Sequence, residues 1–571
     1  MKEVNSKTRI RILTSLVVVI AGIVLARLFF LQVLETENYK ALADHQYISP
    51  VTDAFDRGSI FFKGRDGDLI SAATLKNGFK IIGSPDKIIN PENEYTELSS
   101  ILTLDHDTFI ARMSKKNDSH EEIAVKVGKD DADKIQKLGL PGISIETQKW
   151  RVYPGGPLAA QTLGFVAYKG DELSGRYGVE RQYDTTLERT KTNGEVNFFA
   201  EVFDNIKDSV FANEQSQGDV VLTIEPQVQA ELELQINEIQ KAYSAQRVGG
   251  IIMDPKTGAL YALGTAPGFD LNEFSKVQDP LTFGNPLVEN VYEMGSVIKP
   301  LVMAAALDAK VVTPQTTYLD KGSVVVADRT IYNFDKRGRG IASMQDVLNQ
   351  SLNTGMVFVE QHLGKEKMHE YLTAYGLEEK TGIDLPGEIK SLTSNLRNNN
   401  DVEFANAAFG QGIALTPIAT VRAFASLANG GTLVTPHILD KIVYHEGTTS
   451  FVPDYPTRPV KITKESAEEL TGMLVTVYDK ALLGGKYKME HYSIAAKTGT
   501  AQVAKENGAG YYDDKHLHSF FGYFPAYDPK FLVFLFALDP KGVNYAAYSL
   551  ADPFSHIAKF LLNYYNVPPD R

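Results

Sequence analysis

The apolar run at residues 12–34, ILTSLVVVIAGIVLARLFFLQVL, is the feature that most constrains how this chain folds. A helix that spans a bilayer needs about 20 mostly apolar residues, and this run is long enough. Basic residues precede it within residues 1–11, and Glu35 and Glu37 follow it. The positive-inside rule then places residues 1–11 in the cytoplasm and residues 35–571 on the other side of the membrane.

A cleaved signal peptide is the competing interpretation of this run. Signal peptides have a shorter apolar core, which ends in a cleavage site of small residues of the A-x-A type. The run has no such site after it, so we predict an uncleaved single-pass anchor. Arg27 interrupts the run, and its side chain would extend to the interface or face a partner helix.

Composition excludes several kinds of function. The net charge of −13 argues against nucleic acid as a partner, because phosphate binding requires clustered Lys and Arg. The chain has no cysteine, so it has no disulfide, no thiolate nucleophile and no cysteine-based zinc site. The 11 histidines are scattered, and we interpret His516 and His518 as surface residues rather than a metal pair. We predict no metal site.

The pattern of polar and hydrophobic residues changes near residue 218. Residues 35–217 are polar with short β-like runs, which predicts an irregular α+β domain. A strand at 218–226, an amphipathic helix at 228–243 and two strands around a turn within 248–264 come next. Long helices and a few strong strands follow, which predicts helices packed on an antiparallel sheet in residues 218–571. The expected fold class is therefore α+β, with two domains beyond the anchor.

The stretch EMGSVIKP, residues 293–300, places a serine three positions before a lysine at the start of an apolar helix. Pro300 is tolerated only in a first helical turn, so we expect the helix to begin at or just before Ser296. Lys299 then lies on the same face as the Ser296 hydroxyl. A desolvated lysine loses its proton readily and can act as a base toward a serine. An isolated S-x-x-K is more often a helix cap beside a solvated lysine.

Two further motifs favour a catalytic role for Ser296 and Lys299 over a helix cap. Ser351-Leu352-Asn353 is an S-x-N ahead of a second apolar helix. Lys497-Thr498-Gly499-Thr500 lies on a predicted buried strand. Gly499 would let a substrate backbone approach that strand, and the Thr500 N–H could stabilise an oxyanion. S-x-x-K, S-x-N and K-T-G in this order form the motif set of penicillin-binding proteins and serine β-lactamases.

The chain resembles a class B penicillin-binding protein, a membrane-anchored peptidoglycan D,D-transpeptidase, over nearly its whole length. Besides the triplet, the resemblance rests on RLFFLQV around Arg27, on Arg57-Gly58-Ser59-Ile60 and Gly64-Arg65-Asp66-Gly67, on GRYGVERQYDTTL (175–187), on TGIDLPGE (381–388) and on FGQGIALTPIA (409–419). Met294 and Leu352 depart from the usual motifs, and neither position supplies a reacting atom. Gly64 departs from the motif of the pedestal, where the change concerns partner docking.

The resemblance implies a cytoplasmic tail (1–11), a transmembrane anchor (12–34), an elongated pedestal domain (35–217) and a serine β-lactamase-like transpeptidase domain (218–571). It also implies the chemistry. Ser296 would attack the carbonyl between the two terminal D-alanines of a stem peptide, with Lys299 as general base. Ser351 would relay a proton to the departing D-alanine, and Asn353 would position Lys299.

The remaining implied roles concern binding. Lys497, Thr498 and Thr500 would hold the terminal carboxylate, with Gly499 between them. The N–H groups of Ser296 and Thr500 would form the oxyanion hole. β-Lactams would acylate Ser296, and neither a metal nor an organic cofactor is implied. The implied location is the bacterial inner membrane, with a polytopic glycan polymerase as partner and a role in division rather than elongation.

Three alternatives remain from the sequence. A serine β-lactamase or a D,D-carboxypeptidase shares the triplet but is usually shorter. A catalytically silent scaffold of a wall-synthesis complex would have no reason to keep the three motifs. An elongation-type transpeptidase of the same class differs from a division-type enzyme only in overlapping features.

Overall fold

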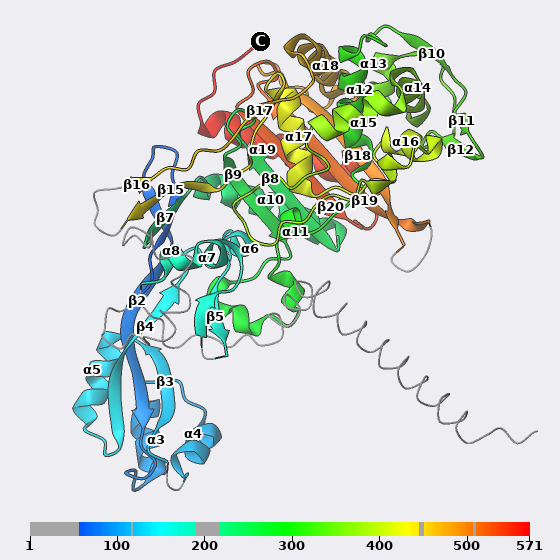
Figure 1. Ribbon diagram of the computed structural model, residues 1–571. Coiled ribbons are helices and arrows are strands. Elements are labelled where there is room, and N and C mark those ends of the chain that lie inside the picture. Colours follow the sequence, from blue (N-terminus) through cyan, green and yellow to red (C-terminus); the bar gives the residue numbers. More distant parts are fainter. Residues whose placement is uncertain (1–55, 116–117, 171, 190–216, 445–449, 506–509) are drawn as a thin grey trace, which may run out of the picture.

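The computed structural model describes residues 56–571, apart from residues 116–117, 171, 190–216, 445–449 and 506–509 (Figure 1). The predicted tail at 1–11 and the predicted anchor at 12–34 lie outside the described residues. Within the described part of the chain, no helix combines the length and the apolar character needed to cross a membrane.

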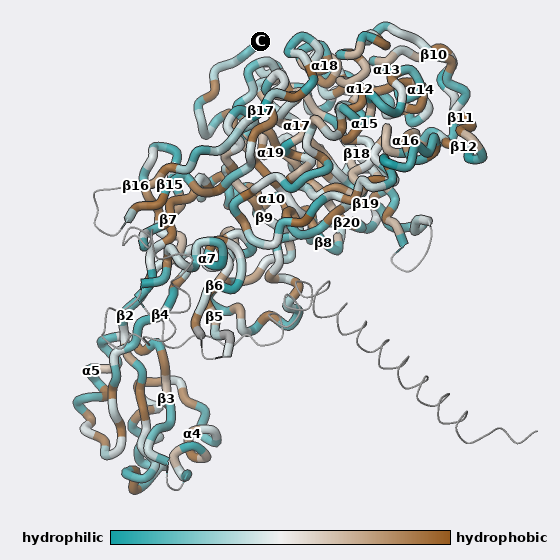
Figure 2. The backbone as a smooth tube through the Cα atoms, in the orientation of Figure 1, coloured by the Kyte–Doolittle hydropathy of each residue, from teal (hydrophilic) through white to brown (hydrophobic). Residues whose placement is uncertain are grey.

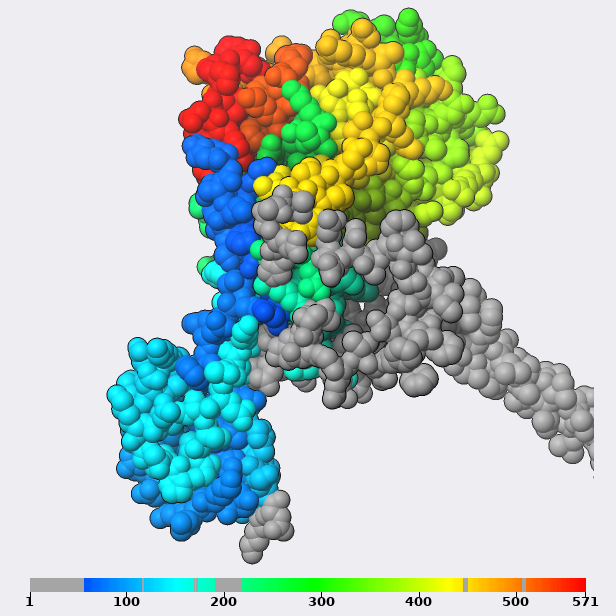
Figure 3. Space-filling model, turned by 60° about the vertical axis from the view of Figure 1, so that its left-hand side comes forward, coloured from blue at the N-terminus to red at the C-terminus, as the bar shows by residue number. Residues whose placement is uncertain are grey.

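The smaller lobe of the molecule is an α+β head at the end of a narrow column, as the blue and cyan surface in Figure 3 shows. Its antiparallel sheet consists of β2 (Leu69–Gly83), β3 (Glu121–Val127) and β4 (Ile143–Val152). Three helices cover the sheet: α3 (Pro91–Ser99), α4 (His106–Met113) and α5 (Lys129–Leu138). Ile81, Leu98 and Phe109 are at the centre of this small core.

Strand β2 connects the head to the rest of the molecule. It has 15 residues, and at the usual rise of a strand it is about 50 Å long. Its first half pairs with β1 (Ile60–Lys63), and its second half pairs with β3 and β4 in the head. One continuous strand therefore forms the column and makes this domain elongated.

The base of the column is a sheet built from distant parts of the chain. Strand β1 pairs in parallel with β7 (Gly218–Leu222), and β7 pairs antiparallel with β15 (Leu439–Tyr444), next to β16 (Ser450–Phe451). A boundary between residues 217 and 218 passes through this sheet. The pedestal and the large domain thus share hydrogen-bonded strands at their junction.

Short elements fill the neck beside this sheet. They are α6 (Ala160–Leu163), β5 (Val166–Lys169), β6 (Glu172–Gly175), α7 (Gly178–Gln182) and α8 (Asp184–Leu187). A buried ion-pair cluster holds them to the column. Glu180 accepts hydrogen bonds from Arg57 Nε at 2.8 Å, Arg151 Nε at 2.6 Å and Tyr153 Oη at 3.2 Å. Arg57 Nη2 also lies 2.7 Å from Asp184 Oδ1.

A five-stranded sheet is the centre of the large domain. Its order is β18 (Ala495–Ala504), β19 (Tyr511–Phe524), β20 (Phe531–Leu538), β8 (Arg247–Met253) and β9 (Leu260–Ala266). All neighbouring strands are antiparallel, as predicted. Strand β18 is at the edge, so one side of the K-T-G strand is free of sheet partners.

Helices cover both faces of this sheet. α10 (Pro226–Tyr243) and α19 (Ala546–Tyr564) pack on one face, where Phe520 stacks on Phe554. α12 (Lys299–Asp308) and α17 (Pro417–Ala428) pack on the other, where Phe521 stacks on Phe424. Hydrophobic segments accordingly concentrate in the sheet and in the helices next to it (Figure 2).

The remaining helices and short strands complete the large domain. The helices are α11 (Pro286–Glu289), α13 (Met344–Asn349), α14 (Asn353–Leu363), α15 (Lys365–Ala374), α16 (Asp401–Ala407) and α18 (Lys464–Thr476). Short strands pair as β10 (Thr317–Asp320) with β13 (Gly340–Ser343), β11 (Ser323–Val326) with β12 (Arg329–Tyr332), and β14 (Thr432–Leu433) with β17 (Arg458–Pro459).

Candidate active site

The S-x-x-K serine lies in a tight turn before a buried helix. Gly295–Ile298 form a 3₁₀ turn, and α12 begins only at Lys299. The α-helix therefore starts three residues later than the sequence predicts, with Pro300 in its first turn. Residues three apart are aligned in a 3₁₀ turn, so Ser296 and Lys299 still share one face.

Two glycines make this turn possible. Gly295 has φ +65°, and a Cβ there would lie 3.2 Å from the Thr500 carbonyl carbon. A Cβ on Gly499 would lie 2.8 Å from the Met294 carbonyl oxygen and 2.9 Å from the Val297 nitrogen. The missing side chains therefore let the turn that carries Ser296 pack directly against the K-T-G strand β18.

This contact corrects the prediction for Gly499. The sequence suggested that Gly499 makes room for a substrate backbone. The space beside its Cα is instead occupied by the protein's own segment Met294–Val297 and by Ser519 Oγ. Gly499 does not line the cavity described below, because its open side faces the turn and not the substrate.

Lys299 is completely buried and directed at the S-x-N segment. Its Nζ donates to the Ser351 carbonyl oxygen at 2.6 Å, to Ser351 Oγ at 3.2 Å and to Asn353 Oδ1 at 2.9 Å. The Asn353 amide nitrogen donates in turn to the Tyr332 carbonyl oxygen at 3.0 Å. Asn353 is thus oriented with its oxygen toward Lys299.

The Ser351 hydroxyl lies between two lysines. Lys497 Nζ donates to Ser351 Oγ at 3.1 Å and to the Thr498 carbonyl oxygen at 2.9 Å. Ser351 has φ +55°, a left-handed conformation that non-glycine residues rarely adopt. This backbone turn directs both the carbonyl and the hydroxyl of Ser351 at Lys299.

Both lysines are buried without an acidic partner. Among the described residues, no carboxylate lies within 4.0 Å of either ammonium group. Burial lowers the pKa of Lys299 well below its ordinary value, and the charge of Lys497 lowers it further. Burial also lowers the pKa of Lys497 to about 7. A lysine with a lowered pKa can accept a proton at neutral pH, which is what a serine nucleophile needs from its base.

The motifs meet at a cavity of about 930 Å³. Of the residues singled out from the sequence, those lining it are Ser296, Ser351, Asn353, Lys497, Thr498 and Thr500. Lys299 does not line the cavity but is buried behind these residues, where it contacts Ser351 and Asn353. A cavity of this size accommodates a peptide-sized ligand, and the free edge of β18 can pair with an extended backbone.

The sequence did not predict the residues that form the other walls of the cavity. One wall comes from the end of β12 and the loop after it, with Tyr332, Phe334 and Arg339. A second comes from the π-helical turn Val477–Ala481, and a third from the start of α19, with Tyr545 and Tyr548. The aromatic and basic residues crowded into IYNFDKRGR (331–339) were the one available signal for the first wall.

The surface interpretation of the histidine pair is wrong for His518. Strand β19 begins at Tyr511, so His518 lies in mid-strand, where it is fully buried and hydrogen-bonded to Ser549 Oγ at 2.8 Å. His516 lines the cavity. No group of three metal-binding side chains exists among the described residues.

Comparison with known proteins supplies the family. Residues 248–560 match the penicillin-binding protein transpeptidase domain, and residues 54–223 match the penicillin-binding protein dimerisation domain. The chain belongs to the class B penicillin-binding proteins. As a member of this family it is a serine-type peptidoglycan D,D-transpeptidase of cell wall synthesis.

Relatives of this penicillin-binding protein extend over nearly its full length. Stage V sporulation protein D of Bacillus subtilis (strain 168) is 29% identical over 566 residues, which cover 97% of this chain and 85% of that protein. Peptidoglycan D,D-transpeptidase FtsI of Buchnera aphidicola subsp. Baizongia pistaciae is 26% identical, covering 100% of this chain and 97% of that protein.

A solved structure supports the fold of this penicillin-binding protein. Penicillin-binding protein 3 from Mycobacterium tuberculosis, in complex with aztreonam, superposes with a TM-score of 0.68 at 22% identity. The match covers 92% of this chain and 98% of that chain.

Proposed function

We propose that this penicillin-binding protein cross-links stem peptides through an acyl-enzyme on Ser296, with Lys299 as the general base. The observation that carries the proposal is the buried Lys299, which has no acidic partner among the residues that the structure describes and lies at the end of the turn that holds Ser296. Its lowered pKa makes the neutral amine available to take the Ser296 proton.

The reaction then proceeds in two acyl transfers. Ser296 Oγ bonds to the carbonyl carbon between the terminal D-alanines while its proton passes to Lys299. The C–N bond breaks, and the departing D-alanine amine receives a proton through Ser351 Oγ, which bridges both lysines. An amine of a second stem peptide attacks the ester, forms the cross-link and returns Ser296 to its hydroxyl form.

The other residues serve binding in this proposal. Lys497 and the hydroxyls of Thr498 and Thr500 hold the substrate carboxylate at the cavity wall. The backbone N–H groups of Ser296 and Thr500 stabilise the oxyanion. A β-lactam occupies the same place and acylates Ser296. The fold shared with the aztreonam-bound protein supports this proposal.

Intact-mass analysis of the full-length chain in detergent, after incubation with a penicillin, tests the proposal. We expect one adduct per chain on wild type and none on Ser296→Ala. Rapid destruction of the drug with only a trace of adduct would favour a β-lactamase. A D-Ala-D-Ala peptide assay separates a drug-insensitive transpeptidase from a silent scaffold, because only the enzyme releases D-alanine.

We further propose that the protein is anchored by residues 12–34, with its bulk outside the inner membrane, and that it acts beside a polytopic glycan polymerase at the division septum. The relative named FtsI and the pedestal-plus-transpeptidase architecture support this assignment. Depletion should produce filaments with unfinished septa, whereas an elongation enzyme would produce rounded cells.

A second candidate role is spore formation. The relative that is 29% identical over nearly the whole chain is named for a sporulation stage. If this role is correct, depletion should leave vegetative division intact and reduce the yield of heat-resistant spores. Counting filaments and spores in the same depleted culture distinguishes the two roles.

A further inference from the structure

The S-x-N segment lies between two helix ends, and only the first of them is capped locally. Ser351, with φ +55°, follows the last turn of α13, where the Leu352 N–H donates to the Val347 carbonyl oxygen at 3.0 Å. Helix α14 begins at Asn353, and its N-cap residue Leu352 makes no side-chain hydrogen bond to the helix. The first N–H groups of a helix need partners, so residues outside 351–354 must supply them to α14.

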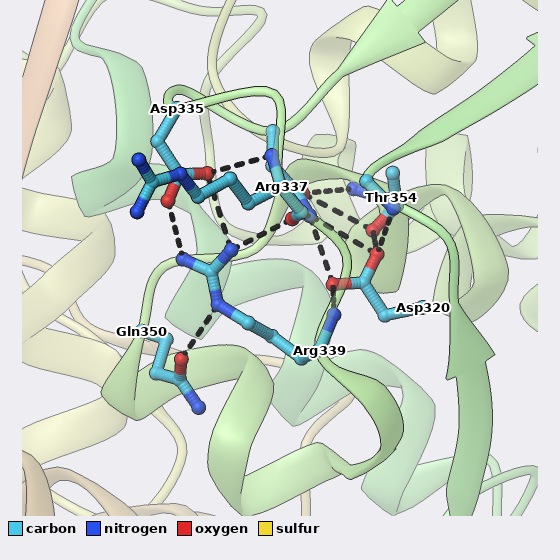
Figure 4. Close-up of polar contacts among 8 residues, drawn as sticks. Asp320, Asp335, Arg337, Arg339, Gln350 and Thr354 are labelled. Atoms are coloured by element: carbon cyan, nitrogen blue, oxygen red, sulfur yellow. Dashed lines mark hydrogen bonds and ion pairs between the residues drawn. The ribbon is translucent and has the colours of Figure 1, made fainter.

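The external partners come from the segment between β10 and β13. Asn333 Oδ1 accepts from the Thr354 N–H at 3.2 Å and so replaces the missing cap of α14. Asp320 Oδ1 accepts from the Thr354 hydroxyl at 2.8 Å, and both Asp320 oxygens accept from Asn333 Nδ2 at 3.0 Å. These three side chains are buried, with exposed fractions of 2%, 1% and 4% for Asp320, Asn333 and Thr354. Figure 4 shows this cluster.

Asp320 is the centre of this cluster. Besides its side-chain donors, it accepts from the Gly322 N–H at 2.9 Å and from the Arg339 N–H at 2.9 Å. Its negative charge lies at the N-terminus of α14, where the helix dipole favours an anion. Hydrogen bonds to a carboxylate are stronger than neutral ones, so one side chain fixes the loop and the helix start together.

The same loop also contacts Gln350, the residue that precedes Ser351. Arg339 Nε donates to Gln350 Oε1 at 2.9 Å, and Asp335 holds the Arg339 guanidinium at 2.9 Å (Figure 4). Tyr332, from the same region, accepts through its carbonyl oxygen from Asn353. The loop thus contacts residues on both sides of Ser351 and Leu352.

We propose that Asp320 is a positioning residue for the transpeptidase reaction: through Asn333 and Thr354 it sets where Ser351 and Asn353 meet Lys299 and Lys497. Asp320 does not line the cavity, so it acts only through these residues. The proposal rests on the function assigned to Ser296 and Lys299 above. It makes the hairpin segment 317–343 part of the catalytic machinery.

The test compares two carboxylates in the full-length protein. Asp320→Asn keeps the size of the side chain and removes its charge. Asp308→Asn is the matched control, since Asp308 at the end of α12 also accepts several hydrogen bonds, from Tyr371 and Thr463, away from the cavity. The rate of Ser296 acylation by a fluorescent penicillin is measured against drug concentration, which separates binding from the acylation rate constant.

We expect Asp320→Asn to lower the acylation rate constant by about tenfold to 100-fold, because small misplacements of reacting groups cost that much. Asp308→Asn should acylate at the wild-type rate, and drug affinity should stay near the wild-type value in both variants. Equal acylation by Asp320→Asn and wild type would overturn the proposal. An equal loss in both variants would also overturn it, because the cause would then be general destabilisation.

A second pair decides the matter if Asp320→Asn does not fold. Thr354→Val removes the hydroxyl that donates to Asp320 at nearly constant volume, whereas Thr354→Ser keeps it. We expect slower acylation in Thr354→Val and near wild-type acylation in Thr354→Ser. The reverse order, or no difference, would contradict the proposal.

The outcome for wild type separates this proposal from the function itself. A wild-type adduct on Ser296 together with unchanged variants refutes the positioning role alone. No adduct on wild type refutes the proposed function, and the positioning role with it. A crystal structure of Asp320→Asn gives a readout without activity, since the proposal requires the Ser351 hydroxyl to move away from Lys299.

Discussion

Two regions of this protein bury charge in opposite ways. In the neck, the fully buried Glu180 is hydrogen-bonded to Arg57 and Arg151. Burial alone would raise the pKa of Glu180, but the two guanidinium groups lower it below its ordinary value. In the active site, Lys299 and Lys497 are also buried, no carboxylate in the described part of the chain lies within 4.0 Å of either ammonium group, and both lysines have lowered pKa values.

The two ways of burying charge serve different purposes: the neck cluster stabilises the fold, and the active-site lysines are suited to proton transfer. A buried acid between two cations stays charged, and its removal leaves uncompensated charge. Buried cations that face only neutral acceptors have a lowered pKa, so they lose a proton more readily. This burial costs stability, but it makes the neutral amine available as a base. Changing one group at a time in each region tests this contrast.

The largest expected effect is on catalysis. Ser296→Ala and Lys299→Ala should each reduce acylation by a penicillin by about 10⁴-fold or more, because groups that act as a unit cannot substitute for one another. The double variant should be no slower than the slower single variant. Quenched-flow acylation measures this, and a double variant that is slower by the product of the single effects would contradict the proposed pairing.

The neck should respond in stability and not in chemistry. Glu180→Gln leaves Arg57 and Arg151 buried without a counter-charge, which should cost about 3–5 kcal/mol in the free energy of unfolding. Urea denaturation followed by tryptophan fluorescence reports this region directly, since Trp150, the one tryptophan, is on β4 beside Arg151. Acylation per folded molecule should stay within about twofold of wild type. A strong loss of acylation in the folded variant would show that the two regions are coupled.

The pH dependence of acylation should be bell-shaped. As the proposed base, Lys299 acts only when neutral, so the rate should fall by about tenfold per pH unit below its pKa. As the proposed carboxylate-binding residue, Lys497 acts only when charged, and its pKa is about 7, so the rate should fall again above neutral pH. Lys497→Arg keeps the charge at high pH and should remove the alkaline fall. An alkaline limb that persists in Lys497→Arg would assign it to another group.

The smallest expected effect is a gain in stability. The pKa of Lys497 is about 7 in the folded protein and 10.5 ordinarily, so between these values the unfolded chain binds more protons. The burial penalty is therefore complete below pH 7 and disappears as pH rises to 10.5. Lys497→Met should raise the melting temperature by about 2–4 °C at pH 6, with less gain at pH 10. A lower melting temperature would mean that the hydrogen bonds of Lys497 outweigh its desolvation.

Much of the fold followed from local pattern. The amphipathic helix at 228–243, the two strands around the turn before Ala259 and the strong strand near 531–539 all occur as predicted, because each has its own hydrophobic period and turn residues. The sheet at the base of the column could not be predicted, since its strands pair residues far apart in the chain, Ile60 with Val220 and Val220 with Ile442. Nothing in a local pattern specifies such a pairing.

The active site also has features that the sequence predicts and features that only the folded structure shows. The sequence by itself predicted which residues carry the chemistry, because S-x-x-K, S-x-N and K-T-G each need particular side chains at a fixed spacing. Only the tertiary structure decided what surrounds them. Gly499 accommodates the Ser296 turn, Lys299 and Lys497 are buried with no carboxylate of the described residues within 4.0 Å, and Asp320 accepts a hydrogen bond from Thr354 next to the S-x-N segment. Burial and long-range hydrogen bonds depend on segments that meet only when the chain is folded, and these set the pKa values and the geometry.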